Sequence, residues 1–124
     1  MKYLCIVYNN EKVLQSMSAA EGQALVDEAL DYNETLRRSG HFIAANALQP
    51  VHTATTVRVK NGKASVTDGP YAETHEQIGG NVLIEAKDLN EAIQLAAGIP
   101  PARMGAVEIR PIMELTRSSE KRPK

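Results

Sequence analysis

The stretch from Asp68 to Gly80 gathers side chains that could perform acid–base chemistry. It runs Asp-Gly-Pro-Tyr-Ala-Glu-Thr-His-Glu-Gln-Ile-Gly-Gly, combining carboxylates, a histidine and an aromatic ring outside any regular periodicity. A histidine flanked by carboxylates can act as a general base, because neighbouring negative charge raises its pKa. Loops carry binding and catalytic residues more often than the elements they join. We therefore expect a candidate site here, with Asp68 and His75 as catalytic groups and Tyr71 and Glu73 contacting a substrate.

The same stretch also suits a purely structural role. Asp68-Gly69-Pro70 favours a turn, Gly79-Gly80 lets the backbone bend into a following strand, and Tyr71 would anchor the loop to the core. The sequence leaves these two interpretations open. A metal site is not predicted, because no second histidine lies at ligand spacing from His75. We expect no cofactor, since neither a phosphate-binding loop nor a dinucleotide fingerprint occurs.

Two further charged residues, Glu108 and Arg110, lie two positions apart among apolar neighbours near the end of the chain. Alternate residues of a strand share one side, so the two side chains should be neighbours. A charge at a half-buried position requires a partner. The pair is either an ion pair or the polar wall of a substrate-binding pocket, in which Arg110 would hold an anionic group.

Strands and helices that must position these residues are indicated by the hydrophobic periodicity. Ser18-Ala19-Ala20-Glu21 has capping-box spacing, and apolar residues recur at helical intervals until Gly40, which predicts a helix over 19–39. Asp88 and Gly98 bound a second helix in the same way. Short apolar runs predict strands over 3–8, 41–48, 81–86 and 105–113.

A hairpin is the clearest local signal. Two runs rich in valine and threonine, residues 55–60 and 63–67, flank Asn61-Gly62, the dipeptide preferred in type I′ turns. This register predicts that Val57 lies opposite Val66 and that Lys60 faces Lys63.

Without the hairpin, the order is β-α-β-β-α-β, the ferredoxin-like α+β arrangement with both helices on one face of an antiparallel sheet. The first strand, however, is apolar on both sides. Two helices cannot cover both faces of the sheet. We therefore expect a homodimer in which the open faces of two sheets pack together as an α/β barrel.

Length and composition limit the classes of function. The 124 residues suffice for one domain, expected over 1–115, followed by a flexible basic tail over 116–124. A net charge of −1 without a basic cluster argues against nucleic-acid or membrane partners. The lone Cys5 lies in an apolar run and is expected in the core. No signal peptide or membrane span is evident, so a cytoplasmic protein is predicted.

The segment Asp68-Gly69-Pro70-Tyr71-Ala72-Glu73-Thr74 resembles the signature of the YCII-related family, in its DGPF subgroup. The neighbouring segments 54–58 and 76–80, the opening Met1-Lys2-Tyr3, and residues 99–103 leading to 107–111 resemble the same subgroup in the same order. The resemblance covers roughly residues 1–113 and implies the dimeric α/β-barrel fold.

The resemblance implies less about activity. The wider family includes proteins with a histidine–aspartate pair whose histidine lies on or near the first helix, but the first helix expected here contains no histidine. Only Asp68 is carried over. His75 replaces the family's usual lysine, and Asn81 replaces an aromatic residue that often follows the paired glycines. Family genes often neighbour those of extracytoplasmic-function sigma factors, which implies a regulatory partner of that kind.

The sequence therefore supports two hypotheses about function. The first is a small-molecule-binding protein or acid–base enzyme without a redox cofactor, whose pocket lies near the Asp68–Gly80 stretch and the dimer interface. The second is a non-catalytic regulatory partner of a sigma factor. Whether the protein is an enzyme is left open by the sequence.

Overall fold

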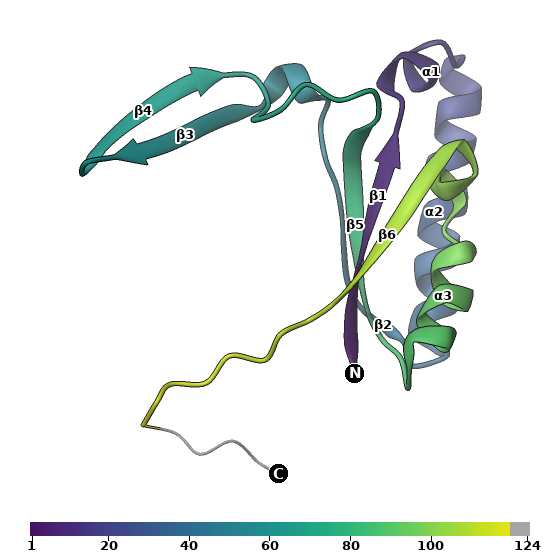
Figure 1. Cartoon of the computed structure of the whole chain (residues 1–124). Helices are drawn as coiled ribbons and strands as arrows, with labels where there is room; N and C mark the ends of the chain where they lie inside the picture. The colour runs from purple at the N-terminus through teal and green to yellow at the C-terminus, as the bar shows by residue number, and fades with distance from the viewer. Residues whose placement is uncertain (120–124) are drawn as a thin grey trace.

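A computed structural model describes residues 1–119 (Figure 1). Its elements are β1 (Lys2–Asn9), α1 (Glu11–Gln15), α2 (Ala19–Arg38), β2 (Phe42–Ala47), β3 (Thr55–Lys60), β4 (Lys63–Asp68), β5 (Gln77–Glu85), α3 (Leu89–Ala97) and β6 (Gly105–Pro111). Two 3₁₀ turns, Val51–Thr53 and Pro100–Met104, lie in the connections. Residues 112–119 form neither helix nor strand, and the rest of the expected tail, 120–124, lies outside the described residues.

Helix α2 starts with the capping box that its sequence predicts. The Ser18 hydroxyl accepts a hydrogen bond from the Glu21 backbone N–H at 3.1 Å, and the Glu21 carboxylate accepts one from the Ser18 N–H at 3.1 Å. These bonds satisfy two backbone donors that the first helical turn would otherwise leave free. Arg37 and Arg38 occupy the last turn, where cations suit the negative end of the helix dipole. The Asp88 carboxylate caps α3 in the same way, 2.9 Å from the Glu91 N–H.

The main sheet has the strand order β2-β5-β1-β6, and all its neighbouring strands are antiparallel. Without α1 and the hairpin β3–β4, the elements follow the order β-α-β-β-α-β. This order and the strand arrangement together define the ferredoxin-like topology, which confirms the predicted fold class. Both long helices, α2 and α3, lie against one face of the sheet (Figure 1).

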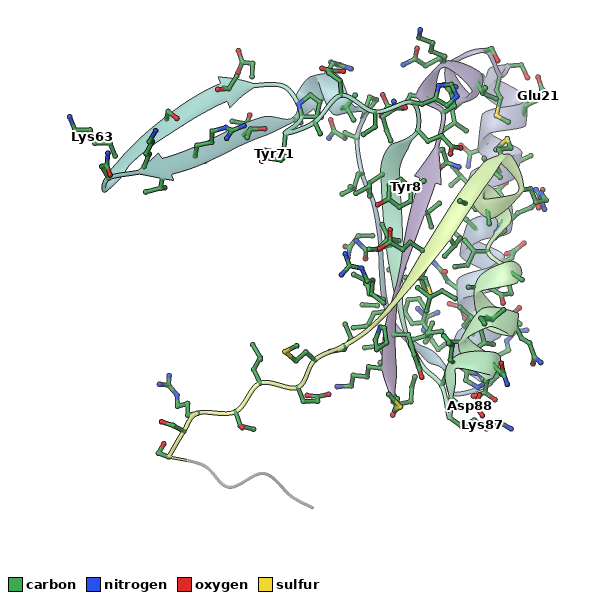
Figure 2. The ribbon with its side chains drawn as sticks, viewed as in Figure 1. Tyr8, Glu21, Lys63, Tyr71, Lys87 and Asp88 are labelled. Atoms are coloured by element: carbon green, nitrogen blue, oxygen red, sulfur yellow. The ribbon has the colours of Figure 1, made fainter. Side chains whose placement is uncertain are left out.

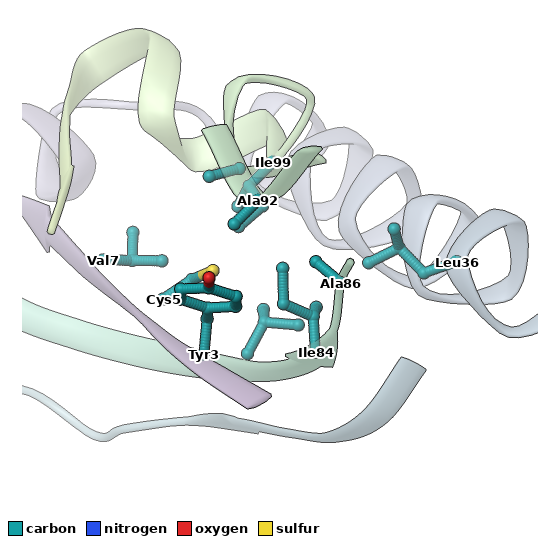
Figure 3. Packing of buried hydrophobic residues seen from close by; sticks show 10 residues of the cluster. Tyr3, Cys5, Val7, Leu36, Ile84, Ala86, Ala92 and Ile99 are labelled. Carbon is teal, nitrogen blue, oxygen red and sulfur yellow. The ribbon is translucent and has the colours of Figure 1, made fainter. Parts of the chain in front are cut away.

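The core fills the space between that face and the two helices. Alternate residues of β1 point into it, and Tyr3, Cys5 and Val7 are each at most 5% exposed. Leu36 of α2 and Ala92 of α3 belong to the same cluster on the helical side, with Leu36 next to Ala86 (Figure 3). The remaining buried apolar residues are Val82, Ile84, Ala86, Ala96 and Ile99. The prediction that Cys5 is a core residue is confirmed.

The opposite face of the sheet carries no helix (Figure 1). We call it the open face; strand alternation and the register place on it the side chains of Leu4, Ile6, Tyr8, Ala44, Asn81, Leu83, Glu108 and Arg110. Leu4 pairs with Leu83 on one side and with Arg110 on the other. An apolar strip therefore runs through the middle of this face, with a charged border along β6.

The hairpin β3–β4, which we call the arm, forms a two-stranded sheet of its own and projects from the body (Figure 1). Its register is the predicted one, with Val57 opposite Val66 and Lys60 opposite Lys63. Asn61 and Gly62 both have positive φ, +51° and +75°, as a type I′ turn requires. The dipeptide thus determines both the turn and the pairing.

Three features differ from the sequence-based expectation. A short helix, α1, follows β1, because the Asn10 side chain accepts from the Lys12 N–H and caps it. Strand β5 begins at Gln77, not Asn81, since Gly80 lies between β1 and β2 where a side chain would not fit. Strand β6 ends at Pro111 and not at Met113. Within residues 1–119, no helix combines the length and apolar character needed to cross a bilayer.

Candidate functional site

The residues predicted from the Asp68–Gly80 stretch lie at the base of the arm. Asp68 ends β4 opposite Thr55, and residues 69–76 form the β4–β5 loop. Tyr71, Glu73 and His75 are exposed on this loop. Tyr71 is 73% exposed, with the Arg58 guanidinium 4.9 Å from its ring centroid. Tyr71 therefore stacks on the arm and does not anchor the loop in the core.

Hydrogen bonds within the β4–β5 loop explain its conformation. The Thr56 hydroxyl donates to the Gly69 carbonyl at 2.8 Å, and Gly69 has a φ of +109°, which strongly favours glycine. The Gln77 amide donates to the Thr74 carbonyl at 2.7 Å. Among the described residues, no hydrogen bond or ion pair joins Asp68 to His75. These contacts are compatible with the interpretation of the Asp68–Gly80 stretch as a structural turn and loop.

The predicted pair Glu108 and Arg110 lies elsewhere, on the open face. The Arg110 guanidinium donates to the Glu108 carboxylate at 2.7 Å, and the Tyr8 hydroxyl lies 3.4 Å from the other carboxylate oxygen. The bond from Arg110 lowers the pKa of Glu108. Figure 2 shows Tyr8 on the sheet and Tyr71 at the arm, so the six predicted residues form two groups and not one site.

A cavity lies on the helical side of the sheet, between α2, the end of β2 and the first part of β5. Its volume is about 430 Å³. Apolar side chains form most of its wall, chiefly Val7, Leu14, Leu25, Val26, Ala29, Leu30, Ala45, Leu48 and Val82. Gln77, Gly79 and Gly80, at the end of the Asp68–Gly80 stretch, contribute to the lining. None of the six predicted site residues does.

The polar groups of this cavity are mainly carboxamides. Asn9 is 4% exposed, and its amide donates to the Pro101 carbonyl at 2.9 Å. That bond fixes the Asn9 side chain, whose oxygen lies so close to Gly79 that a Cβ there would be 2.9 Å away. The carboxamides of Asn33, Gln15 and Gln77 also belong to residues of the lining, whereas strand alternation directs the side chains of Asn46 and Asn81 to the open face. These groups offer both donors and acceptors to a bound molecule without adding charge.

Two titratable groups belong to the lining, Glu11 and Tyr32. The Glu11 carboxylate accepts from the Val51 N–H at 3.0 Å, while its own N–H donates to the Gln77 side chain at 2.9 Å. The Tyr32 hydroxyl donates to the Leu95 carbonyl at 2.6 Å, and burial raises its pKa. Glu11 therefore supplies the carboxylate of this lining, and a carboxylate is one of the groups that can serve as a general base.

A histidine–carboxylate contact that the sequence did not predict occurs between α2, β2 and α3. The Ser39 hydroxyl lies 2.7 Å from His41 Nδ1, and His41 Nε2 lies 3.2 Å from the Glu91 carboxylate. The order hydroxyl–imidazole–carboxylate is that of a nucleophilic triad. None of the three residues lines the cavity, however, and the Ser39 hydroxyl also donates to the Leu36 carbonyl at 3.0 Å. We infer that the contacts among Ser39, His41 and Glu91 have a structural role and hold α2, β2 and α3 together. The signal that could have found this contact is Ser39-Gly40-His41, at the end of the predicted helix.

The remaining groups of chemical interest are structural. Burial raises the pKa of the Cys5 thiol to about 11, which keeps it protonated and unreactive at neutral pH. Residues 1–119 contain no cluster of three or more histidine, cysteine, aspartate or glutamate side chains suited to a metal.

Comparison with known proteins agrees with the fold. A solved structure of 5-chloro-2-hydroxyhydroquinone dehydrochlorinase from Burkholderia phenoliruptrix, in complex with 2,5-dihydroxybenzoquinone, superposes with a TM-score of 0.53 at 14% identity, over 91% of this chain and 94% of that one. An uncharacterised protein of Rhizobium meliloti (strain 1021) is 32% identical over 114 residues, covering 90% of this chain and 92% of the relative. The family model described as the YCII-related domain matches residues 1–116. The chain therefore belongs to the YCII-related domain family.

Proposed function

We propose that the protein binds a small, neutral and largely apolar molecule in the cavity between α2, β2 and β5. The observation that carries this proposal is the cavity itself: about 430 Å³, with apolar walls and a few convergent carboxamides. Small-molecule sites typically occupy roughly 300–1,000 Å³ and combine these two kinds of lining. Gln77, Gly79 and Gly80, at the end of the Asp68–Gly80 stretch, border this cavity, but it lies on the helical side of the sheet and not at the expected dimer interface.

The lining favours a ring that carries hydroxyl or carbonyl groups. Carboxamides such as Asn9, Asn33 and Gln77 can donate to a carbonyl and accept from a hydroxyl. A strongly anionic ligand would find no cationic side chain in this lining, and it would face the Glu11 carboxylate. The dehydrochlorinase was solved with 2,5-dihydroxybenzoquinone, a ring of this general type. At 14% identity the likeness shows the fold alone. The hydroxyl groups of this quinone are vinylogous carboxylic acids and ionise at neutral pH, so a neutral ring such as hydroquinone is the compound to test first.

If the protein is an enzyme, Glu11 is the group that we propose as its base. It lies in the cavity and is held by the Val51 N–H. The catalytic roles expected for Asp68 and His75, and the binding roles expected for Tyr71, Glu73, Glu108 and Arg110, stay predictions. They require a ligand at the base of the arm or on the open face. The sigma-factor hypothesis likewise stays a prediction, and copurification from the native host would test it.

The proposal is tested by filling the cavity. Ala29 lines it from α2, whereas Ala24 is an exposed residue of the same helix outside the lining. The neutral probe N-phenyl-1-naphthylamine should fluoresce with the wild type and be displaced by a neutral ring such as hydroquinone. Ala29→Leu should weaken probe binding by roughly tenfold or more, because the added carbons occupy the site. Ala24→Leu should bind as the wild type does.

Two results would contradict the proposal. One is a probe that binds Ala29→Leu as well as the wild type. The other is loss of binding in Asp68→Asn or His75→Gln with Ala29→Leu unaffected, which would place the site at the base of the arm. Circular dichroism of each variant confirms that a loss of binding does not reflect unfolding.

We also propose that the protein is a homodimer formed through the open face. Leu4, Ile6 and Leu83 lie at the centre of that face and are only half-buried in a single copy. Pairing two open faces would place these residues in an apolar layer between two sheets about 10 Å apart. Leu83→Gln, in the middle of the strip, should shift the protein towards monomer in sedimentation velocity.

A further inference from the structure

The arm is the part of the molecule that the packing of one chain leaves unexplained. Strand alternation and the observed register put Val57, Val59, Ala64 and Val66 on one face of the arm. The three valines are 58%, 70% and 67% exposed. A two-stranded hairpin alone in water is at best marginally stable, and the usual remedy is to pack its apolar face on another element. The described part of this chain supplies no such element, since β3 and β4 form a sheet of their own.

The direction of the arm shows where a covering surface would lie. Figure 1 shows the arm leaving the body on the side opposite α2 and α3, which is the side of the open face. The described segment after β6 leaves on the same side. That segment exposes Met113 and Leu115, which are 77% and 82% accessible. A body seated on the open face would therefore lie between the arm and this segment.

The accessible surface is also larger than one compact chain should have. The protein exposes 9196 Å², whereas a compact monomer of 13.5 kDa exposes about 6,500 Å². The excess of about 2,700 Å² compares with roughly 800 Å² per partner in a standard interface and up to about 2,500 Å² in an obligate one. The arm and the exposed segment after β6 both contribute to this excess, and its size is compatible with a sheet-to-sheet contact that also involves the arms.

We propose that the arm of each chain reaches across to a second copy of the same chain and packs its valine face on that copy. The proposal rests on the homodimer proposed above and adds the arm to its interface. Six strand residues extend about 20 Å, while two packed sheets lie about 10 Å apart. The arm is therefore long enough to pass the partner's sheet. Two-fold symmetry makes the exchange reciprocal, so both hairpins are covered at once.

The test separates the arm from the open face. Val57→Thr and Val66→Thr keep the β-branched shape that strands favour but place a hydroxyl on the valine face. Together they should raise the dimer dissociation constant, measured by sedimentation equilibrium, by roughly tenfold or more. Arg58→Thr with Ser65→Thr changes the opposite face at neighbouring positions and should leave the constant within roughly threefold.

Photo-crosslinking identifies the occupant. Benzoylphenylalanine at Val59, in a mixture of ¹⁵N-labelled and unlabelled chains, should yield crosslinks that join one labelled and one unlabelled peptide. At Ser65, on the other face, the yield should be much lower. Crosslinks only within one chain, or only to another protein or nucleic acid in a lysate, would overturn the proposal.

The experiments distinguish a failure of the arm proposal from a failure of the homodimer proposal. A wild type that sediments as a monomer at all concentrations would overturn the homodimer and the arm together. A dimer that Leu83→Gln dissociates and Val57→Thr/Val66→Thr does not would leave the homodimer standing and overturn the role of the arm. Near-ultraviolet and far-ultraviolet circular dichroism show whether each variant is folded.

Discussion

At the scale of single residues, the Glu91 carboxylate lies where three segments of the chain meet. It accepts from the Lys87 backbone N–H at 3.0 Å and lies 3.2 Å from His41 Nε2. These contacts lower the pKa of Glu91, the bond from the Lys87 N–H contributing most. The charged form is therefore favoured in the folded state over the unfolded one.

Glu91 should contribute to the acid sensitivity of the protein. A carboxylate whose folded pKa lies below its unfolded value, about 4.5, stabilises the fold above that value. This contribution is lost as the pH falls through the lowered folded pKa. Glu91→Gln should therefore lose less stability than the wild type between about pH 6 and about pH 3. Urea midpoints at both pH values measure this.

The exposed Glu73→Gln serves as the control for that measurement, because no hydrogen bond or ion pair of Glu73 occurs among the described residues. It should retain the pH dependence of the wild type. Equal pH dependence in Glu91→Gln and the wild type would show that the contacts of Glu91 do not stabilise the charged form.

At the scale of elements, glycines in different environments explain where the main sheet and α2 tolerate a side chain. Gly80 lies between β1 and β2, where an added Cβ would be 2.5 Å from the Asn46 carbonyl oxygen. Gly22 lies in α2, where an added Cβ meets nothing within 4 Å. The same substitution should therefore have opposite effects at the two positions.

Gly22→Ala should stabilise the protein by about 0.5–1 kcal/mol, because alanine loses less conformational freedom than glycine in a helix. Gly80→Ala should destabilise it by about 1–3 kcal/mol, since the backbone of β2 or β5 must shift to relieve the overlap. Thermal and urea unfolding measure both changes. A stabilising Gly80→Ala would contradict the close approach of β2 and β5.

The elements that were predicted well are those specified by local chemistry. Asn61-Gly62 determined the arm and its register, and Ser18 with Glu21 determined the start of α2. The start of β5 was missed, because the signal of Gly79-Gly80 is shared by loops and by close backbone approach. Only the neighbouring strands decide between the two.

At the scale of the whole molecule, the protein has two large apolar surfaces that one chain leaves uncovered. One is the strip along Leu4, Ile6 and Leu83 on the open face, and the other is the valine face of the arm. Both surfaces would be removed from water in the same assembly step. Folding stability and association are then linked by mass action.

The midpoint of thermal unfolding should therefore rise with protein concentration. Over roughly a hundredfold range the shift should be several degrees, because the proposed dimer would stabilise the folded state more as concentration increases. Differential scanning fluorimetry or calorimetry measures it. The monomer-favouring Leu83→Gln should show a flatter dependence. A midpoint independent of concentration in the wild type would contradict a dimer linked to folding.

The sequence alone determined the fold class, the helix caps and the hairpin register, since each depends on residues close together in the chain. It also indicated the open face, because both parities of β1 are apolar. Only the tertiary structure decided which groups meet. The cavity draws its wall from α1, α2, β2 and β5, and the His41–Glu91 contact joins residues far apart in sequence. The Asp68–Gly80 stretch, chemically the richest segment, folds largely around its own hydrogen bonds, and its end borders a cavity that no local pattern could predict.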